Sequence, residues 1–318
     1  MSHFGLIAAG AALVVSAGAA AQGYPTKPVR VIAPFAAGSG TDIVARIVSE
    51  ELRVALGANF VVDNRAGGSG QIAAELVAKA APDGYTLMVS TNTPHSANPF
   101  LFKKLNYDPV RDFTPVSKLI HYLFVVAVNP ALPIKTPQEL VSFIKSNPGK
   151  VQYAHGNSTG QVAGAYFTHA GKFDALAVPY KSTPPAMTDM IGGQVHYMFV
   201  DWAASQGHIK GGRLRAIAVM SDKRSTILPE LPPIGDAVPG FDMVPWAGSF
   251  SAAGTPKAVV DRLDAEIRKI MDKPAVRERM IGLGLEPAYA GPAEFGAFVK
   301  GQLKAWGDKI RAAGIQPE

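Results

Sequence analysis

The sequence contains no cysteine and no run of basic residues, and these two absences narrow the range of functions. Without cysteine among its 318 residues, the chain has no disulfide, no thiolate nucleophile and no cysteine-based zinc site. Its 31 Lys and Arg residues against 25 Asp and Glu residues give a net charge of +6, but they are scattered without a basic stripe interleaved with aromatics. A nucleic acid is therefore a poor partner. The mild positive field suits small anions better.

Metal-binding and nucleotide-binding signatures are also missing. The seven histidines show no His-Glu-x-x-His or comparable spacing, and no cluster of Asp and Glu suggests a calcium site or a catalytic carboxylate pair. Gly38-Ser39-Gly40 begins like a dinucleotide fingerprint, but Ile43 stands where the third glycine belongs, and there is no P-loop. The sequence thus predicts no metal and no cofactor.

Only one long stretch is continuously apolar, and it lies at the N-terminus. Residues 4–21 are small and apolar, too short and too rich in alanine for a comfortable membrane span. The stretch ends in Ala19-Ala20-Ala21, the A-x-A pattern of a secretory cleavage site, although Met1-Ser2-His3 carries no Lys or Arg. We expect residues 1–21 to be a signal peptide that is cleaved near Ala21 and directs the mature chain out of the cytoplasm.

Just after this segment the sequence predicts a strand, a loop of small residues and a helix. A β-branched run at 29–32 predicts a buried strand, and apolar residues at helical spacing over 43–56 predict a helix. Residues 36–40 are all small, so main-chain N–H groups can lie open there, with Gly40 or Thr41 as the helix cap. Such a helix N-terminus is a ready anion site. The same pattern also fits a tight turn that binds nothing, and this stretch alone leaves both interpretations open.

Strands and helices alternate along the rest of the chain, which favours a parallel α/β sheet. The sequence predicts strands at 60–63, 85–90, 151–154, 176–179, 195–200 and 214–220, a long β-type run at 115–129, and a long stretch at 241–252 that leads back to the first half. It predicts a polar loop at 91–99, and helices at 72–80, 136–146, from 161, at 184–191, 257–272, 275–283 and 292–312.

The order of these elements predicts two similar α/β halves that face each other across a cleft. The β-type run 115–129 is long enough to cross from one half to the other, and the C-terminal helices return to the first half. We expect residues 22–124 and 245–318 to form one domain and residues 125–244 to form the other. Each half would then present a helix N-terminus to the cleft.

One motif suggests catalysis instead. Gly156-Asn157-Ser158-Thr159-Gly160 matches the G-x-S-x-G nucleophile elbow and lies between a predicted strand and a predicted helix. Histidines follow at positions 169, 196 and 208, but no HGGG-type oxyanion loop precedes the motif. A serine hydrolase that uses Ser158 is therefore the main alternative, and an anion-binding loop of small residues is the interpretation that we favour.

Several short motifs, weak alone, are specific in their order and spacing from about residue 24 to residue 257. They are Tyr24-Pro25, Pro28-Val29-Arg30, Pro34-Phe35 with the glycine loop and Asp42, Asn64-Arg65 with Gly67-Gly68, Pro82-Asp83-Gly84-Tyr85-Thr86-Leu87, Val178-Pro179-Tyr180-Lys181, Gly193-Gln194-Val195 and Ala253-Gly254-Thr255-Pro256-Lys257. In this respect the chain resembles the Bug family, the periplasmic solute-binding proteins of tripartite tricarboxylate transporters.

The resemblance implies an α/β, two-domain periplasmic binding protein, type II-like, with a ligand cleft between the lobes and no catalysis. It implies a monomeric receptor in the periplasm that captures a small organic mono- or dicarboxylate and delivers it to the membrane permease subunits of such a transporter. A sensory binding protein for the same ligand would use the same residues. Which carboxylate is bound does not follow from the sequence.

The resemblance also implies where the ligand lies. Family members hold one carboxylate between the loop after the first strand and the matching loop of the second domain, here 35–42 and 155–161. Gln161-Val162 stand where the family usually has a His-Leu pair, so the second loop departs from the pattern beside the expected site. The expected ligand-binding residues are Phe35, Gly38, Ser39, Gly40, Thr41, Asp42, Thr91, Asn92, Thr93, His155, Gly156, Asn157, Ser158, Thr159, Gln161, Tyr180 and Asp201.

Overall fold

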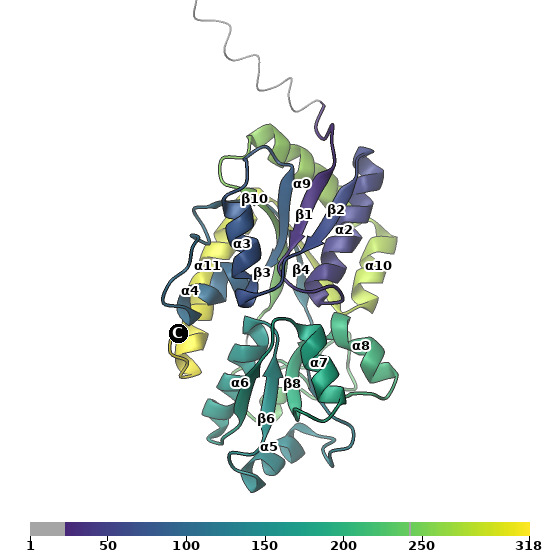
Figure 1. Cartoon of the computed structure of the whole chain (residues 1–318). Helices are drawn as coiled ribbons and strands as arrows, with labels where there is room; N and C mark the ends of the chain where they lie inside the picture. Colours follow the sequence, from purple (N-terminus) through teal and green to yellow (C-terminus); the bar gives the residue numbers. More distant parts are fainter. Residues whose placement is uncertain (1–22, 242) are drawn as a thin grey trace, which may run out of the picture.

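Two separate β-sheets organise the computed structural model, which describes residues 23–241 and 243–318. Each sheet forms the centre of one lobe, and the two lobes are stacked one above the other (Figure 1). The expected signal peptide, residues 1–21, lies outside the described residues. Within the described ranges, every helix is too short or too polar to cross a membrane.

The first lobe has a six-stranded sheet in the order β11-β4-β10-β3-β1-β2. Strand β1 pairs in parallel with β2 and β3. Strand β10 runs antiparallel to both β3 and β4, so the expectation of a parallel sheet is wrong for half of this lobe. The strands are β1 (Val29–Ala33), β2 (Phe60–Asn64), β3 (Thr86–Thr91), β4 (Phe113–Tyr122), β10 (Trp246–Ala252) and β11 (Leu285–Ala290). The helices are α2 (Gly40–Leu56), α3 (Gln71–Ala78), α4 (Asn98–Leu101), α9 (Lys257–Asp272), α10 (Pro274–Gly282) and α11 (Pro292–Ala312).

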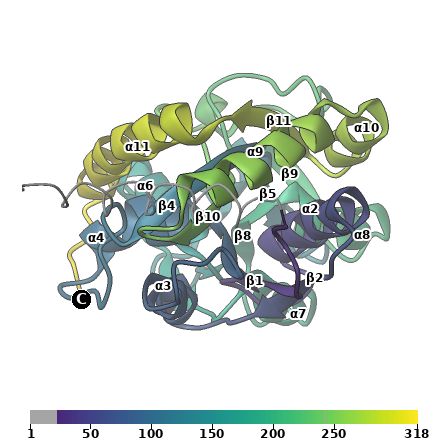
Figure 2. The ribbon, with the colours of Figure 1, turned by 90° about the horizontal axis from the view of Figure 1, so that it is seen from above.

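Helices cover both faces of this sheet because alternate strand residues point to opposite sides. Val31 and Leu87 are buried in one cluster with the apolar faces of α2 and α9. Ile32 and Met88 are buried in another cluster with α3 and α11. Seen from above, α3 and α11 lie to one side of the strands and α2 and α10 to the other (Figure 2).

The second lobe has a five-stranded sheet in the order β7-β6-β8-β5-β9, and β5 is antiparallel to both of its neighbours. Its buried side chains fall into two clusters, one with α5 and α6 and one with α7 and α8. The strands are β5 (Phe124–Val128), β6 (Gln152–His155), β7 (Leu176–Pro179), β8 (Tyr197–Asp201) and β9 (Arg215–Val219). The helices are α5 (Pro137–Ser146), α6 (Ser158–Gly171), α7 (Thr183–Ile191) and α8 (Trp202–Lys210).

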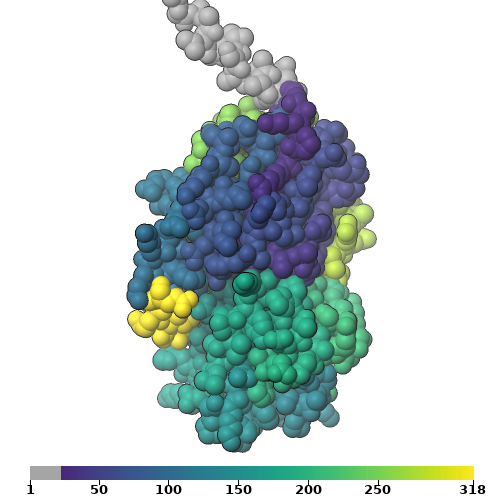
Figure 3. Space-filling view, in the orientation of Figure 1, coloured from purple at the N-terminus to yellow at the C-terminus, as the bar shows by residue number. Residues whose placement is uncertain are grey.

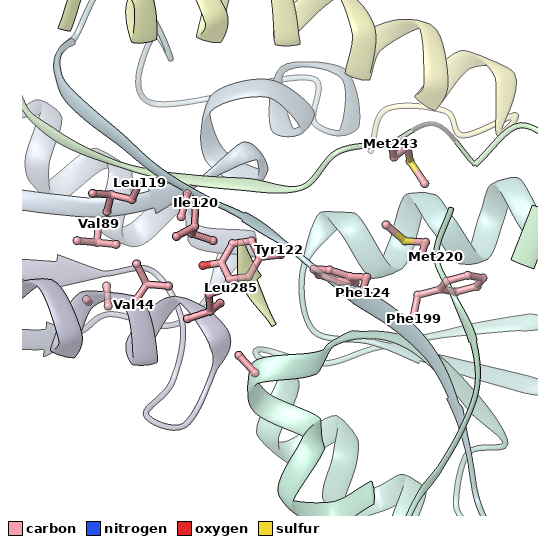
Figure 4. Packing of buried hydrophobic residues seen from close by; sticks show 14 of the residues in the cluster. Val44, Val89, Leu119, Ile120, Tyr122, Phe124, Phe199, Met220, Met243 and Leu285 are labelled. Carbon is pink, nitrogen blue, oxygen red and sulfur yellow. The ribbon is translucent and has the colours of Figure 1, made fainter. Parts of the chain in front are cut away.

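The chain crosses between the lobes at Leu123, the single residue that separates β4 from β5. Its N–H donates to the carbonyl of Gly284 at 3.0 Å, and its carbonyl accepts from the N–H of Trp202 at 2.8 Å. Tyr122 and Phe124 on either side of it are buried, and the apolar core continues past them from one lobe into the other (Figure 4). The expected crossing within 115–129 is confirmed, and the chain returns to the first sheet at β10.

The structure corrects several local predictions. The predicted polar loop 91–99 is a buried π-helical turn at Thr93–Ala97 that leads directly into α4, since its main-chain groups need partners away from water. Helix α6 begins at Ser158 rather than at residue 161. Sequence reasoning missed α8 and β11 altogether, as well as the short 3-10 turns at Gly68–Gly70 and Ile234–Asp236.

Candidate functional site

A small cavity lies where the two lobes meet. Its volume is about 20 Å³, room for roughly one water molecule, so the lobes are closed onto each other. Figure 3 shows the two lobes in contact along this seam on one face of the molecule. The lining comes from segments that follow β1, β3, β6 and β8, together with the crossing point: Phe35, Ser39, Gly40, Thr41, Thr91, Asn92, Thr93, Tyr122, Phe124, Asn157, Thr159, Thr183 and Asp201.

The start of α2 forms one wall. Ser39 is the cap of this helix, in place of the expected Gly40 or Thr41, because its extended backbone lets Oγ accept from the N–H of Asp42 at 3.3 Å. The N–H of Gly38 donates to Asp42 Oδ2 at 3.0 Å and is already engaged. Among the described residues, no acceptor lies on the N–H groups of Gly40 and Thr41. These two donors at a positive helix end suit an anion.

Asp42 braces this wall and does not line the cavity. Its carboxylate accepts from Arg46 Nε at 3.0 Å and from Asn64 Nδ2 at 3.0 Å, in addition to Gly38. Burial opposes its ionisation, but the bonds from Arg46, Gly38 and Asn64 outweigh burial and hold its pKa below the usual value. Asp42 therefore stays ionised and fixes the loop conformation.

The second lobe supplies the opposite wall through the start of α6. Asn157 caps this helix, since Oδ1 accepts from the N–H of Gly160 at 3.0 Å, while Nδ2 donates to Thr183 Oγ1 at 3.3 Å. Thr159 Oγ1 accepts from Asn92 Nδ2 of the first lobe at 2.9 Å. The hydroxyls and amide of this wall are thus held in place by bonds within and between the lobes.

Two further hydrogen bonds join the lobes beside the cavity. Ser158 Oγ donates to Asn98 Oδ1 at 3.1 Å, and both side chains are fully buried. The N–H of Ala36 donates to Ser182 Oγ at 3.1 Å. These contacts define the closed arrangement of the cleft.

Asp201 is the acidic residue of the lining. It ends β8 and caps α8, because Oδ1 accepts from the N–H of Ala204 at 2.9 Å. Burial raises its pKa to about 6, against the opposing effect of that backbone bond. Gly40 approaches it closely: a Cβ atom at Gly40 would lie 2.4 Å from Asp201 Oδ1. The start of α2 and the end of β8 therefore touch across the cleft.

The structure brings most of the predicted residues together, and it places the rest outside the lining. The predicted residues that line the cavity are Phe35, Ser39, Gly40, Thr41, Thr91, Asn92, Thr93, Asn157, Thr159 and Asp201. The predicted residues that do not line it are Gly38, Asp42, His155, Gly156, Ser158, Gln161 and Tyr180. Tyr122, Phe124 and Thr183 were missed; the first two flank the crossing point, and such proximity carries no signal in a single sequence.

The predicted residues outside the lining have other roles. Burial lowers the pKa of His155 to about 4, so its imidazole is neutral at pH 7. The hydroxyl of Tyr180 donates to Asp189 Oδ2 at 2.7 Å. Gly156 packs against the main chain of Ser182, where a Cβ atom would lie 2.2 Å from the carbonyl carbon.

Comparison with known proteins identifies the family of this chain. The family described as "Tripartite tricarboxylate transporter family receptor" matches residues 44–315. This chain belongs to that family. It is 35% identical over 307 residues to a UPF0065 protein of Bordetella bronchiseptica, covering 94% of this chain and 89% of the relative. The resemblance to the Bug family is thereby confirmed.

Solved structures of receptors of this family share the fold. The structure of the periplasmic binding protein BugD superposes with a TM-score of 0.87 at 34% identity, covering 93% of this chain and all of that chain. Rpa4515 of R. palustris, solved with adipate, superposes with a TM-score of 0.90 at 31% identity, with the same coverage. The two-lobed periplasmic binding fold expected from the sequence is confirmed.

The lining of the cavity suits an anion. Four helices, α2, α6, α7 and α8, begin at lining residues or directly after one, and their N-terminal dipole ends favour negative charge. Lining hydroxyls and amides add donors, and Lys and Arg are absent from the lining. Within residues 23–241 and 243–318, no group of three or more His, Asp or Glu side chains is placed to hold a metal ion.

Proposed function

We propose that this receptor captures a small organic carboxylate in the periplasm and hands it to the membrane permease of a tripartite tricarboxylate transporter. The observation that carries the proposal is the cavity between the lobes, which is lined by Gly40 and Thr41, whose N–H groups have no acceptor among the described residues, and by hydroxyl and amide side chains, without a Lys or Arg. Such groups bind a carboxylate through helix ends and hydrogen bonds. Adipate in the related Rpa4515 supports this class of ligand.

The capture mechanism that we propose is closure of the two lobes over the ligand. A cavity of about 20 Å³ is too small for a molecule the size of adipate, so the ligand enters when the lobes separate. The lobes would rotate about Leu123 and the returning segment, with domains at 22–124 with 245–318 and at 125–244. Closure then restores the hydrogen bonds across the seam and excludes water.

The remaining parts of the proposal concern export, assembly and chemistry. The chain would act as a monomer after cleavage near Ala21, and it would have no enzymatic activity. Ser158 suits a structural role because it is fully buried and its Oγ donates to Asn98 Oδ1. In the described part of the chain, no histidine hydrogen-bonds to Ser158, so the serine lacks the general base that a hydrolase needs.

A thermal-shift screen of the mature protein tests the proposal. Succinate, glutarate, adipate, malate, citrate, aspartate, glutamate and several monocarboxylates are added singly, and a ligand of the folded state raises stability by RT ln(1 + [L]/Kd). We expect a concentration-dependent rise in Tm with at least one acid and none with its methyl ester. A screen in which no acid raises Tm, or labelling of Ser158 by a fluorophosphonate, would contradict the proposal.

A further inference from the structure

Asp201 places a buried negative charge beside the position where we expect the carboxylate of the ligand. It is 4% exposed, and it lines the same cavity as the free N–H groups at the start of α2. Its Oδ1 accepts from the N–H of Ala204, and none of the described side chains donates to its carboxylate. Tyr122, the other ionisable residue of the lining, is kept neutral at pH 7 because burial raises the pKa of its phenol.

A plain dicarboxylate fits this arrangement poorly. With a pKa raised to about 6 by burial, Asp201 is mostly ionised at pH 7.5. A ligand carboxylate at the start of α2 lies close to it, because a Cβ atom at Gly40 would be only 2.4 Å from Asp201 Oδ1. Two carboxylates in a cavity with low dielectric repel each other strongly unless a cation or a proton lies between them.

The missing cation is not supplied by the protein. The lining has no Lys, Arg or His. Arg46, beside the first wall, is held by Asp42 and Asn64. A buried charge without a partner is strongly destabilising, whereas a well-placed opposite charge compensates for its desolvation. A proton on Asp201 is disfavoured at pH 7.5, above its pKa of about 6, so the ligand itself is the remaining source of a positive charge there.

We propose that the ligand is an α-amino acid whose carboxylate binds the N–H groups of Gly40 and Thr41 and whose ammonium group pairs with Asp201. The proposal rests on the proposed function and specifies its substrate class. In an α-amino acid one carbon separates the two charged groups, which matches the contact of Asp201 with the start of α2. A hydroxyl in place of the ammonium would donate a hydrogen bond but leave the buried charge uncompensated.

Matched ligand pairs test the proposal by calorimetric titration at pH 7.5. The pairs are aspartate and succinate, glutamate and glutarate, 2-aminoadipate and adipate, and leucine and 4-methylpentanoate. We expect the amino acid to bind at least tenfold more tightly than its plain partner in the pair that fits the cavity. The Asp201→Asn variant should invert this preference: the amino acid loses at least tenfold in affinity, and the plain acid gains because the repulsion is gone.

The Asp201→Asn variant is chosen because Asn still caps a helix, so α8 keeps its first hydrogen bond. Asp42→Asn is the matched control, since it removes the other buried carboxylate near α2, which does not line the cavity. It should change the affinity for both members of a pair by the same factor. Circular dichroism and Tm of both variants establish that each is folded.

Several outcomes would overturn the assignment. The assignment fails if the plain acid binds more tightly than its amino partner in every pair, or if malate binds more tightly than aspartate. Equal effects of Asp201→Asn on both members of the fitting pair would remove Asp201 from ligand recognition. If no acid binds, plain or amino-substituted, the proposed function fails together with this proposal; if plain acids alone bind, the receptor assignment stands and the amino-acid assignment falls.

Discussion

Gly40 allows the two walls of the cavity to come into contact. The sequence predicts only that it is one of several small loop residues that leave main-chain N–H groups open. The structure gives a different reason: the positive φ, +80°, belongs to Gly38, whereas Gly40 must be small because Asp201 of the other lobe approaches it. The constraint acts across the closed cleft, so it concerns binding more than folding.

Gly40→Ala should therefore weaken ligand binding while the fold is kept. The added Cβ would meet Asp201 Oδ1 at 2.4 Å only when the lobes are closed, and alanine is a good residue for the start of a helix. We expect a loss of at least tenfold in affinity, about 1.4 kcal/mol, in a titration with an acid that binds the wild type.

Gly301→Ala is the control for that experiment. Gly301 is an exposed residue of α11, and a Cβ atom there would meet nothing within 4 Å. Its affinity should equal that of the wild type. If Gly40→Ala also binds like the wild type, the start of α2 and Asp201 do not meet in the liganded state.

At the scale of elements, the lobes are joined by hydrogen bonds that lie outside the lining of the ligand cavity. Ser158 lies at the start of α6 but outside the cavity lining, and its Oγ bonds Asn98 at the start of α4. Closure forms this bond in a water-free seam, where a partner left alone is unfavourable. The motif that suggested a nucleophile thus links two helices of different lobes.

Ser158→Ala should weaken binding without touching the ligand. Losing one buried hydrogen bond costs about 1 kcal/mol, so affinity should fall about fivefold. Thr168→Val is the control, because Thr168 lies on the same helix and its Oγ1 bonds only Ala165 of that helix. A hydrolase would behave differently: Ser158→Ala would retain substrate binding and lose turnover.

Helices and strands were predicted well where the pattern of apolar side chains is clear, and poorly where tertiary packing decides. Helices with an apolar stripe, such as α2 and α9, were placed within two residues, because periodicity survives in a single sequence. The segment 91–99 was predicted as a loop because its residues are polar, but tertiary packing buries them: His95, for example, stacks on Phe250 of β10. Helix α8 lacks a clear apolar stripe, and β11 is an edge strand with few buried residues.

The same limit applies to the site. The residues that follow β1, β3, β6 and β8 were predicted from the resemblance to the Bug family, and their positions agree with the rule that loops at the ends of parallel strands gather at one edge of a sheet. Thr183, by contrast, reaches the cavity through α7, and Phe124 reaches it through the crossing between the sheets. Their positions depend on how the two lobes meet, which local sequence patterns do not record.

At the scale of the whole molecule, buried imidazoles tie stability to pH. Burial lowers the pKa of His95 to about 4 and that of His155 to about 4. His121 shares this shift, mainly through burial and also through nearby Lys118. In the unfolded chain a histidine titrates near 6.5. Between about pH 6.5 and 4, the unfolded state therefore binds more protons than the folded state.

The sign of the effect follows from this difference. When the unfolded state binds more protons, stability rises with pH, so the full contribution of these histidines is present above about pH 6.5 and is lost as the pH falls towards 4. Asp201 acts in the opposite direction, because burial raises its pKa to about 6 and the folded state then binds the extra proton between pH 6 and 3.8. Three groups outweigh one, so acid should destabilise the protein.

We therefore expect the free energy of unfolding to fall steadily from pH 7 to pH 4.5 in urea titrations. The shift at the fully buried His95 alone corresponds to about 3 kcal/mol over its whole range. Asp201→Asn should raise stability at pH 7 and make the fall on acidification steeper, because it removes a group that opposes the histidines. A flat profile, or imidazole NMR signals from these three histidines that titrate near pH 6.5 in the folded protein, would show that they are hydrated and that the lobes are packed less tightly around them than the structure has it.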